Sequence, residues 1–594
     1  MLPGGRRLMK SRKLVIVSFF ILLLLTGIFV FKDYGLYWDE EVHRNRGLGF
    51  LAYVLHGNHS LMNDEVQRSY GALPDIILAG VETGFGLQNH PRTLYLVRHF
   101  IVFLIFYLGV VFFFFLGQKL FGSWRIGLLG CLFLVLSPRF FAQAFYNAKD
   151  IPLLAAMIAA FFTLVRFFEK PNPLNLVLHA LACAVATNVR VAGILIVLLT
   201  GAAFVFLFWE KRRVGKDLLQ VFKQAAIFGV LYFVFLVPMW PTLWENPIGR
   251  FAQALQLSEK IPYLGRVFYG GKIVEVIRLP WHYVPVWIAV SIPLLYLFLF
   301  IIGVASLFSD FLGKHRPDRL KRFFGFLFSL WFFVPVLMFM VGRARIYDEW
   351  RHLYFVYPAL LLLSLKGLQA AAQTIHTMAG VRSRVLANTV ITALVLIGLA
   401  PVTFFMVRYH PYQYVYFNRL AGRDMASAAR KFELDYWGLS YKQGLEYLLR
   451  LDRSTQIKVL VDNLPGELNA LILPREERQR LKFIDPQTLI TIPENDPLIR
   501  FLWRYPGRYN YNFFHNTLTC RGRMTEAEKA ELLSIYQDTR DRKAVEWLFL
   551  ATQNNDTPKY FLTNYRLRPR EFPMEKINSI DVGNAPILGL YLFR

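Results

Sequence analysis

The stretch LVIVSFFILLLLTGIFVF, residues 14–31, decides the fold class of this chain. It has nearly the length and apolar character that a helix needs to cross a bilayer core, which takes about 20 residues. No small-residue cleavage site follows it, so we predict a retained signal anchor rather than a cleaved signal peptide. Five basic residues precede it, as expected of a cytoplasmic flank: Arg6, Arg7, Lys10, Arg12 and Lys13.

Similar apolar stretches recur over the first two thirds of the chain. We predict a polytopic α-helical membrane protein with about eleven transmembrane helices, near residues 14–31, 98–117, 126–142, 151–168, 174–188, 191–209, 222–240, 285–308, 323–342, 353–370 and 387–407. The composition agrees, because 55% of the residues are hydrophobic and only 18% are charged, whereas soluble domains carry about 25% charged residues.

Basic residues set the predicted orientation in the membrane. The N-terminus and the loops on its side hold about 20 of them, and the short loops on the other side about six. Lys and Arg collect on the cytoplasmic side, so we predict a multi-pass inner-membrane protein with a cytoplasmic N-terminus. This distribution also explains the net charge of +26 without nucleic acid, which we do not expect as a partner.

An odd number of spans places the polar end of the chain outside the cytoplasm. We predict a transmembrane module over residues 1–407, with long outer loops at 32–97 and 241–284, followed by a periplasmic α/β domain over 408–594. β-rich runs at 457–461 and 560–563 indicate strands in that domain, and amphipathic stretches near 424–451 and 524–550 indicate helices.

Three polar motifs fall on the predicted outer face. They are Tyr37–His43 after the first span, Ser137–Arg139 with Asn147–Asp150 between the third and fourth, and Tyr347–His352 between the ninth and tenth. Nothing in their sequence separation requires a shared side. Charged groups kept at a membrane boundary usually serve a substrate, a partner or a proton path. We therefore expect the functional site on this face.

Each motif also has a structural interpretation. Asp39 and Glu40 have the composition of a solvated helix cap, and Asp150 suits the N-cap of the fourth span, with Pro152 in its first turn. Arg139 and Arg351 are long enough to reach lipid headgroups from the membrane boundary. The sequence alone leaves these alternatives open.

The motifs resemble those of the C-type glycosyltransferase superfamily (GT-C), in particular its protein O-mannosyltransferase and aminoarabinose-transferase-like branch. Trp38-Asp39-Glu40-Glu41-Val42-His43 is similar to the diacidic motif of the mannosyltransferases, with one additional Glu. Ser137–Arg139 and Asn147–Pro152 resemble the second outer-loop motif of bacterial members. The resemblance covers about residues 30–360 and is weak over the C-terminal domain.

This resemblance implies a GT-C fold and an enzyme that moves a sugar, with inversion, from a polyprenyl-phosphate carrier in the membrane to an extracytoplasmic lipid, glycan or protein. Asp39 would be the catalytic base, Glu40 would assist it, and Asp150 would be a second acidic site. The departing lipid phosphate needs cationic groups. The outer motifs offer four of them: Arg139, Lys149, Arg351 and His352.

The sequence predicts no metal-ligand set. Cys131, Cys183 and Cys520 are too few and too scattered for a disulfide framework or a metal site, and His43 and His282 stand alone. No cofactor is assigned, although a divalent metal doing the work of a base stays an alternative. Two other functions stay open: a transporter or flippase of a polyprenyl-linked glycan, and a non-catalytic membrane assembly factor.

Overall fold

The computed structural model describes residues 3–213, 218–259, 265–312, 319–342, 346–379 and 384–484, and shorter pieces between 500 and 592. The chain forms two compact units. The first comprises Met1–Tyr34, Asp39–Ile261 and Leu279–Arg423, and the second Gly35–Trp38, Pro262–Arg278 and Asp424–Arg594. The division between domains that the sequence predicts at residue 407 stays a prediction.

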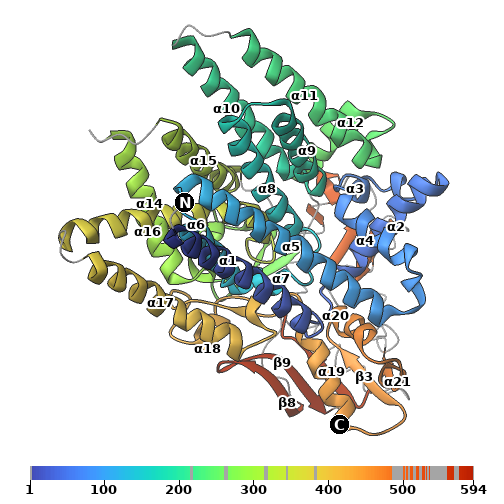
Figure 1. The fold of residues 1–594 in the computed structure, drawn as a ribbon. Helices are drawn as coiled ribbons and strands as arrows, with labels where there is room; N and C mark the ends of the chain where they lie inside the picture. The colour runs from blue at the N-terminus through green and yellow to red at the C-terminus, as the bar shows by residue number, and fades with distance from the viewer. Residues whose placement is uncertain are drawn as a thin grey trace. The chain divides into compact units, whose positions relative to one another are not determined.

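The first unit is built from apolar helices (Figure 1), which confirms the polytopic α-helical class. Within the described residues, eight regions are helical, long and apolar enough to cross a membrane. These regions overlap the helices α1 (Pro3–Val30), α5 (Pro91–Phe121), α8 (Asp150–Glu169), α10 (Ile194–Arg213), α11 (Leu219–Met239), α15 (Arg319–Gly342), α16 (Tyr357–Ala379) and α17 (Arg384–Arg408).

The other three predicted spans coincide with shorter apolar helices: α6 (Trp124–Val135), α9 (Pro173–Val189) and α14 (Leu294–Leu312). The predictions of unbroken helices over 126–142 and 285–308 are wrong. Helix α6 ends before Pro138, which opens the short helix α7 (Pro138–Gln143), and Pro293 separates α13 (Tyr283–Ser291) from α14. Proline lacks the N–H that would continue a helix and disfavours helical geometry in the residue before it.

Short elements complete this unit and carry most of the site. The helices are α2 (Glu40–His56), α3 (Glu65–Arg68), α4 (Leu73–Gly84) and α12 (Pro247–Glu259). The 3-10 turns are η1 (Leu61–Asn63), η2 (Leu87–Asn89), η3 (Val191–Gly193), η4 (Pro241–Leu243), η6 (Arg351–Val356) and η8 (Gln413–Val415).

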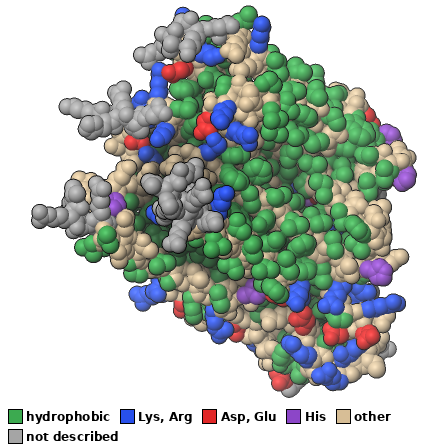
Figure 2. Space-filling model, in the orientation of Figure 1, with side chains coloured by type: hydrophobic (Ala, Val, Ile, Leu, Met, Phe, Trp, Pro, Cys, Tyr) green, Lys and Arg blue, Asp and Glu red, His purple; other side chains and the backbone are tan. Residues whose placement is uncertain are grey.

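The long helices expose large apolar side chains, which cover a broad face of the molecule in Figure 2. Leu14 and Ile21 of α1, Phe233 of α11 and Leu394 and Phe404 of α17 are all exposed. Soluble monomers rarely expose such large contiguous apolar areas. This surface is therefore suited to contact lipid.

Helices α14 and α16 cross in very close contact through two glycines. A Cβ atom added to Gly367 would lie 1.9 Å from the carbonyl oxygen of Leu299 and 2.7 Å from the amide nitrogen of Gly303. A Cβ on Gly303 would lie 1.9 Å from the carbonyl oxygen of Leu363. Small residues at such crossings let membrane helices approach closely.

We expect Gly367→Ala to destabilise the protein by about 1–3 kcal/mol, because the two helix backbones must separate to admit the methyl group. The matched control is Gly229→Ala in α11, where an added Cβ meets nothing within 4 Å. The control should leave stability unchanged or raise it slightly, since Ala favours helix. Thermal unfolding midpoints in one detergent compare the two variants, and equal midpoints would contradict the prediction.

The second unit contains a five-stranded sheet with strand order β4-β3-β7-β9-β8. Strand β3 (Ile457–Val461) pairs in parallel with β4 (Leu481–Phe483) and β7 (Tyr560–Thr563), and β9 (Ala585–Leu592) pairs antiparallel with β7 and β8 (Glu575–Val582). Two-stranded sheets form from β1 (Arg266–Tyr269) with β2 (Lys272–Glu275) and from β5 (Tyr509–Asn512) with β6 (Thr517–Cys520). The strands predicted at 457–461 and 560–563 are confirmed.

One helix of this unit covers the sheet. Leu445 and Leu448 of α19 (Ser440–Leu451) pack with Val459, Leu562 and Leu588 in the main core. The stretch predicted as helical at 424–451 contains both α18 (Met425–Ala429) and α19, and α20 (Pro465–Leu468) and α21 (Arg475–Gln479) follow β3. Most of the helix predicted at 524–550 lies outside the described residues.

The segment Gly35–Trp38 belongs to this second unit and is held by Asn469. The Asn469 side chain accepts the amide N–H of Leu36 at 2.8 Å and donates to the Leu36 carbonyl at 2.9 Å. Gly35 has no room for a side chain, because a Cβ would lie 2.4 Å from Asn469 Oδ1. Trp38, the last residue of the segment, lies 4.7 Å from the Arg566 guanidinium, and Asp39 is the next residue in the chain.

We expect Asn469→Ala to destabilise the second unit, because it leaves two buried backbone groups of Leu36 without their partner. Each such group costs about 1–3 kcal/mol. Hydrogen exchange at the Leu36 amide should accelerate together with a lower unfolding midpoint. The control Asn584→Ala removes an exposed side chain that contacts Asp424 and the Ala426 amide; a larger effect there than at Asn469 would contradict the prediction.

Candidate functional site

Arg351 joins carboxylates from all three predicted outer motifs. Its Nη2 atom lies 3.4 Å from Asp39 Oδ2 and 3.3 Å from Asp348 Oδ2, and its Nη1 atom lies 3.6 Å from Asp150 Oδ2. We call Asp39, Asp150, Asp348 and Arg351 the Arg351 cluster. The structure thus brings together Asp39, Asp150 and Arg351, which were predicted from sequence. Each of them is more than one hundred residues away from the other two in the chain.

Local structure frees Asp39 for this contact. Asp39 is the N-cap residue of α2, the position in which an Asp side chain usually accepts a backbone N–H, yet it makes no such bond. Its carboxylate contacts Arg351 instead. The predicted helix-cap role of Asp39 therefore holds for its position in the chain and not for its side chain.

Asp150 is the first residue of α8 rather than its N-cap, which is Lys149. Asn147 takes over the capping role, because its Oδ1 accepts the amide N–H of Lys149 at 3.2 Å and of Asp150 at 2.9 Å. Asp150 Oδ2 accepts from Asn147 Nδ2 at 3.0 Å, and Oδ1 accepts from Arg190. Sequence analysis missed Arg190, whose only signal is its place in a short outer loop after α9.

The turn before Arg351 adopts a strained backbone. Asp348 and Glu349 have φ angles of 54° and 61°, in the left-handed region, which costs non-glycine residues roughly 1–3 kcal/mol each. Ion pairs hold this turn: Asp348 contacts Arg351, and Glu349 Oε2 accepts from Arg139 Nη1 at 2.6 Å. The strain is consistent with a turn whose purpose is to aim these carboxylates.

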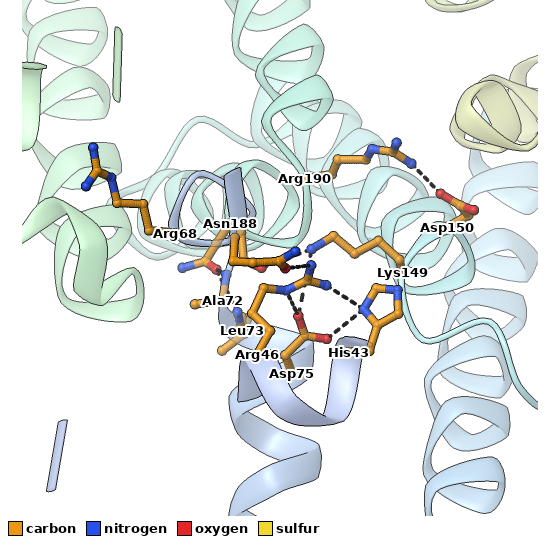
Figure 3. Close-up of polar contacts among 12 residues, drawn as sticks. His43, Arg46, Arg68, Ala72, Leu73, Asp75, Lys149, Asp150, Asn188 and Arg190 are labelled. Carbon is orange, nitrogen blue, oxygen red and sulfur yellow. Dashed lines mark hydrogen bonds and ion pairs between the residues drawn. The ribbon is translucent and has the colours of Figure 1, made fainter. Parts of the chain in front are cut away.

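A second group of charges surrounds Asp75 on α4 (Figure 3). Asp75 Oδ2 lies 2.6 Å from Arg46 Nε and 3.9 Å from Lys149 Nζ, and Oδ1 lies 3.1 Å from His43 Nδ1. Lys149 Nζ also donates to the Gly71 carbonyl at 3.1 Å. We call His43, Arg46, Asp75 and Lys149 the Asp75 cluster. All four side chains are buried.

This burial and pairing shift the protonation equilibria. Burial would raise the pKa of Asp75, but Arg46, Lys149 and His43 together hold that pKa well below its usual range. Burial and the nearby Arg46 lower the pKa of Lys149 well below its usual value, against the opposing effect of Asp75. The Lys149 ammonium is therefore poorly compensated, and an anion arriving beside it would be stabilised.

Asp75 and Arg46 were missed by sequence analysis. Asp75 is the one charged residue of the apolar stretch Leu73-Pro-Asp-Ile-Ile-Leu-Ala-Gly80, and this is the signal that could have identified it. The loop before α4 is closely packed, since a Cβ on Gly71 would lie 1.5 Å from the Asn188 carbonyl oxygen. Asn188 Oδ1 in turn accepts the amide N–H groups of Ala72 and Leu73.

The remaining predicted residues have other partners. Glu40 is buried and accepts from Arg98 Nε of α5 at 2.6 Å; burial raises the pKa of Glu40, and Arg98 opposes that rise. Arg139 is buried and donates to Glu349 and to the Tyr416 carbonyl. His352 is buried with its ring 4.8 Å from that of Tyr347, and its Nδ1 has no hydrogen-bond partner among the described residues.

Comparison with known proteins gives one family match. Residues 77–241 match the family described as dolichyl-phosphate-mannose-protein mannosyltransferase. The matched segment contains Arg139, Lys149, Asp150 and Arg190, and Asp39 and Arg351 lie outside it. No curated protein sequence matches the chain.

Solved structures of two proteins align with most of the chain. ArnT from Cupriavidus metallidurans bound to undecaprenyl phosphate has 15% identity over 97% of each chain, with a TM-score of 0.42; its apo state has 14% identity over 97% of this chain and 98% of that one, with a TM-score of 0.43. The archaeal oligosaccharyltransferase AglB from Archaeoglobus fulgidus, in complex with an inhibitory peptide and a dolichol-phosphate, has 10% identity over 92% of this chain and 69% of that one, with a TM-score of 0.41. At such low sequence identity, these alignments describe a likeness of fold and not of function.

Proposed function

We propose that this chain is a membrane glycosyltransferase of the GT-C type, as the family match over residues 77–241 supports, and that it moves a sugar from a polyprenyl-phosphate carrier to an extracytoplasmic acceptor, with Asp39 as the catalytic base. One observation carries the choice of base. The Asp39 side chain is 28% exposed, whereas those of Asp150 and Asp348 are 2% and 6% exposed. Asp39 is therefore the carboxylate of the Arg351 cluster that an acceptor can reach.

The proposed reaction is a single inverting displacement. The Asp39 carboxylate accepts the proton of the acceptor hydroxyl or amine as that atom attacks the anomeric carbon. The bond between the anomeric carbon and the phosphate oxygen breaks, and its electron pair leaves with the polyprenyl phosphate. Asp150, held by Arg190 and Asn147, serves as the second acidic group beside the site.

Lys149 is the best-placed cation for the departing phosphate. Its buried ammonium is opposed by Arg46, so a phosphate beside it would relieve a charge that the protein compensates poorly. Arg351, Arg139 and His352 stay predicted phosphate ligands, but they are buried, and both arginines already pair with carboxylates. Glu40 stays a predicted assistant to Asp39, paired with Arg98.

Orientation completes the proposal. We place the N-terminus in the cytoplasm, the site on the outer face of the inner membrane and the C-terminal α/β domain in the periplasm. The excess of Lys and Arg in the loops on the N-terminal side supports this placement. A cysteine introduced at the exposed Ser60, in the first outer loop at 32–97, should then react with a thiol reagent that does not cross the membrane.

Replacing Lys149 tests its role in donor binding. We expect Lys149→Met to weaken binding of a polyprenyl-phosphate sugar by about 10- to 150-fold, the loss of one hydrogen bond to a charged group. In the unsubstituted protein, phosphate raises the pKa of Lys149, so binding takes up a proton. Affinity should be highest below the lowered pKa of free Lys149 and should fall as pH rises above that pKa.

The donor is a phosphodiester that does not titrate in this range, so a pH-dependent affinity reports on the protein. Lys149→Met should show a flat profile, because the titrating group is gone. Fluorescence binding assays over a pH series in detergent give both results. A Lys149→Met variant with the pH profile of the unsubstituted protein would remove Lys149 from the donor site.

The function as a whole is tested with the purified full chain in lipid vesicles. Labelled polyprenyl-phosphate hexoses and pentoses are supplied with a cell-envelope acceptor fraction, and both the labelled acceptor and free polyprenyl phosphate are measured. Glycosyl transfer predicts equal amounts of the two products. Counterflow of intact lipid-linked sugar without any covalent product would instead favour the transporter, and partner binding without donor turnover would favour the assembly factor.

A further inference from the structure

A guanidinium occupies the position in which three carboxylates converge. Asp39, Asp150 and Asp348 come from three separate segments, and each places one oxygen within 3.6 Å of Arg351. Arg351 is buried, and its guanidinium carbon lies 5.0 Å from the centre of the Tyr347 ring. Burial and this ring contact fix the cation in place.

The same set of ligands suits a divalent cation. Carboxylate oxygens are the preferred protein ligands of Ca²⁺ and Mg²⁺, and carboxylates also suit Mn²⁺. Here the three oxygens are directed at Arg351 rather than at one another, and no group of three or more metal-ligating side chains suited to a metal occurs among the described residues. The residues present therefore do not fit a metal ion while Arg351 is in place.

Charge explains why a cation is required. The three carboxylates carry three negative charges, and Arg351 and the Arg190 side chain bound to Asp150 bring positive charge to them. Removing Arg351 would take away the positive charge on which they converge, and neighbouring carboxylates repel each other strongly away from water. An arginine stays protonated under all ordinary conditions. The strained φ of Asp348 at 54° directs the third carboxylate to this same cation.

We propose that Arg351 is the resident cation of this centre, replaces a divalent metal ion there, and orients Asp39, so that the protein needs no metal and acquires a metal site only when Arg351 is removed. The inference rests on the proposed function for the role of Asp39. It makes Arg351 a positioning residue, whose charge is used by the carboxylates, in place of the predicted role of Arg351 as a ligand of the donor phosphate. The metal site that its removal creates does not depend on any activity.

Titration of Mn²⁺ into the full chain in detergent tests this directly, with free Mn²⁺ followed by electron paramagnetic resonance. We expect Arg351→Ala and the larger Arg351→Gln each to bind one Mn²⁺ per chain at least about tenfold more tightly than the unsubstituted protein, because a site charge is removed. Arg351→Lys keeps the charge and should gain no site. The control Arg319→Ala removes an arginine that pairs with the single carboxylate of Glu210 and should also gain none.

Transfer assays add a second readout. The unsubstituted protein should keep its rate in EDTA, and Arg351→Ala should lose most of its rate and recover part of it with Mn²⁺. Stoichiometric Mn²⁺ binding by the unsubstituted protein, or no gain of Mn²⁺ by either neutral variant that keeps its native circular dichroism, would overturn the proposal. If Arg351→Ala gains the Mn²⁺ site while the unsubstituted protein transfers no sugar, this inference stands and the proposed function is contradicted.

Discussion

Replacing Asp39 with asparagine is expected to lower the rate of glycosyl transfer by about 10²- to 10⁴-fold, the usual contribution of a general base. The amide matches the carboxylate in size and still presents an oxygen to Arg351, which lies 3.4 Å from Asp39. The variant therefore keeps the shape of the site but cannot accept the acceptor's proton. Donor binding should change little, since Lys149 and its neighbours are untouched.

The measurement compares the initial rate of acceptor labelling with the donor dissociation constant for each variant. Glu41→Gln is the matched control, because Glu41 lies two residues after Asp39 in the motif, and the ion pairs of Arg351 among the described residues do not include it. It should transfer at nearly the unsubstituted rate. A fast Asp39→Asn together with a slow Glu41→Gln would transfer the role of base to Glu41, the additional acidic residue of this motif.

The sequence was sufficient to predict the class of the molecule. Apolar stretches such as residues 14–31 predicted a polytopic membrane protein, which the long apolar helices confirm. The outer motifs around Asp39 and Asp150 predicted a GT-C glycosyltransferase, and residues 77–241, which include Asp150, match a mannosyltransferase family. Such predictions are possible because the thickness of the bilayer sets the length of a spanning helix, and charged residues at a membrane boundary are visible in short segments of sequence. For Asp39, Asp150 and Arg351, the sequence predicted only that they lie on the same side of the membrane, and not that their side chains are in contact.

Side-chain pairing was less predictable. Glu40 adjoins Asp39 in the sequence but pairs with Arg98, and Arg139 pairs with Glu349 instead of facing the Arg351 cluster. These contacts depend on which helix faces pack together, and neighbouring residues on a helix point in different directions. Asp75 belongs to no motif, and its three partners come from α2 and from the start of α8.

Replacing Asp75 with asparagine is expected to destabilise the protein by about 3–5 kcal/mol, the cost of removing one partner from a buried ion pair. The loss leaves Arg46 and Lys149 buried beside each other without a negative charge. Thermal unfolding midpoints of the two proteins in one detergent measure this loss.

A double-mutant cycle separates the charge imbalance from a loss of packing. Asp75→Asn combined with Arg46→Met removes one charge of each sign, so the pair should recover part of the stability that Asp75→Asn alone loses. The pKa of Asp75 is held below its usual value of 3.8, since Arg46, Lys149 and His43 outweigh the effect of burial. Its stabilising contribution is therefore complete above that value and fades as pH falls below it. The stability difference between Asp75→Asn and the unsubstituted protein should shrink in acid. Asp75 would act through shape rather than charge if this difference stayed constant, or if the double variant were destabilised by at least the sum of the two single substitutions.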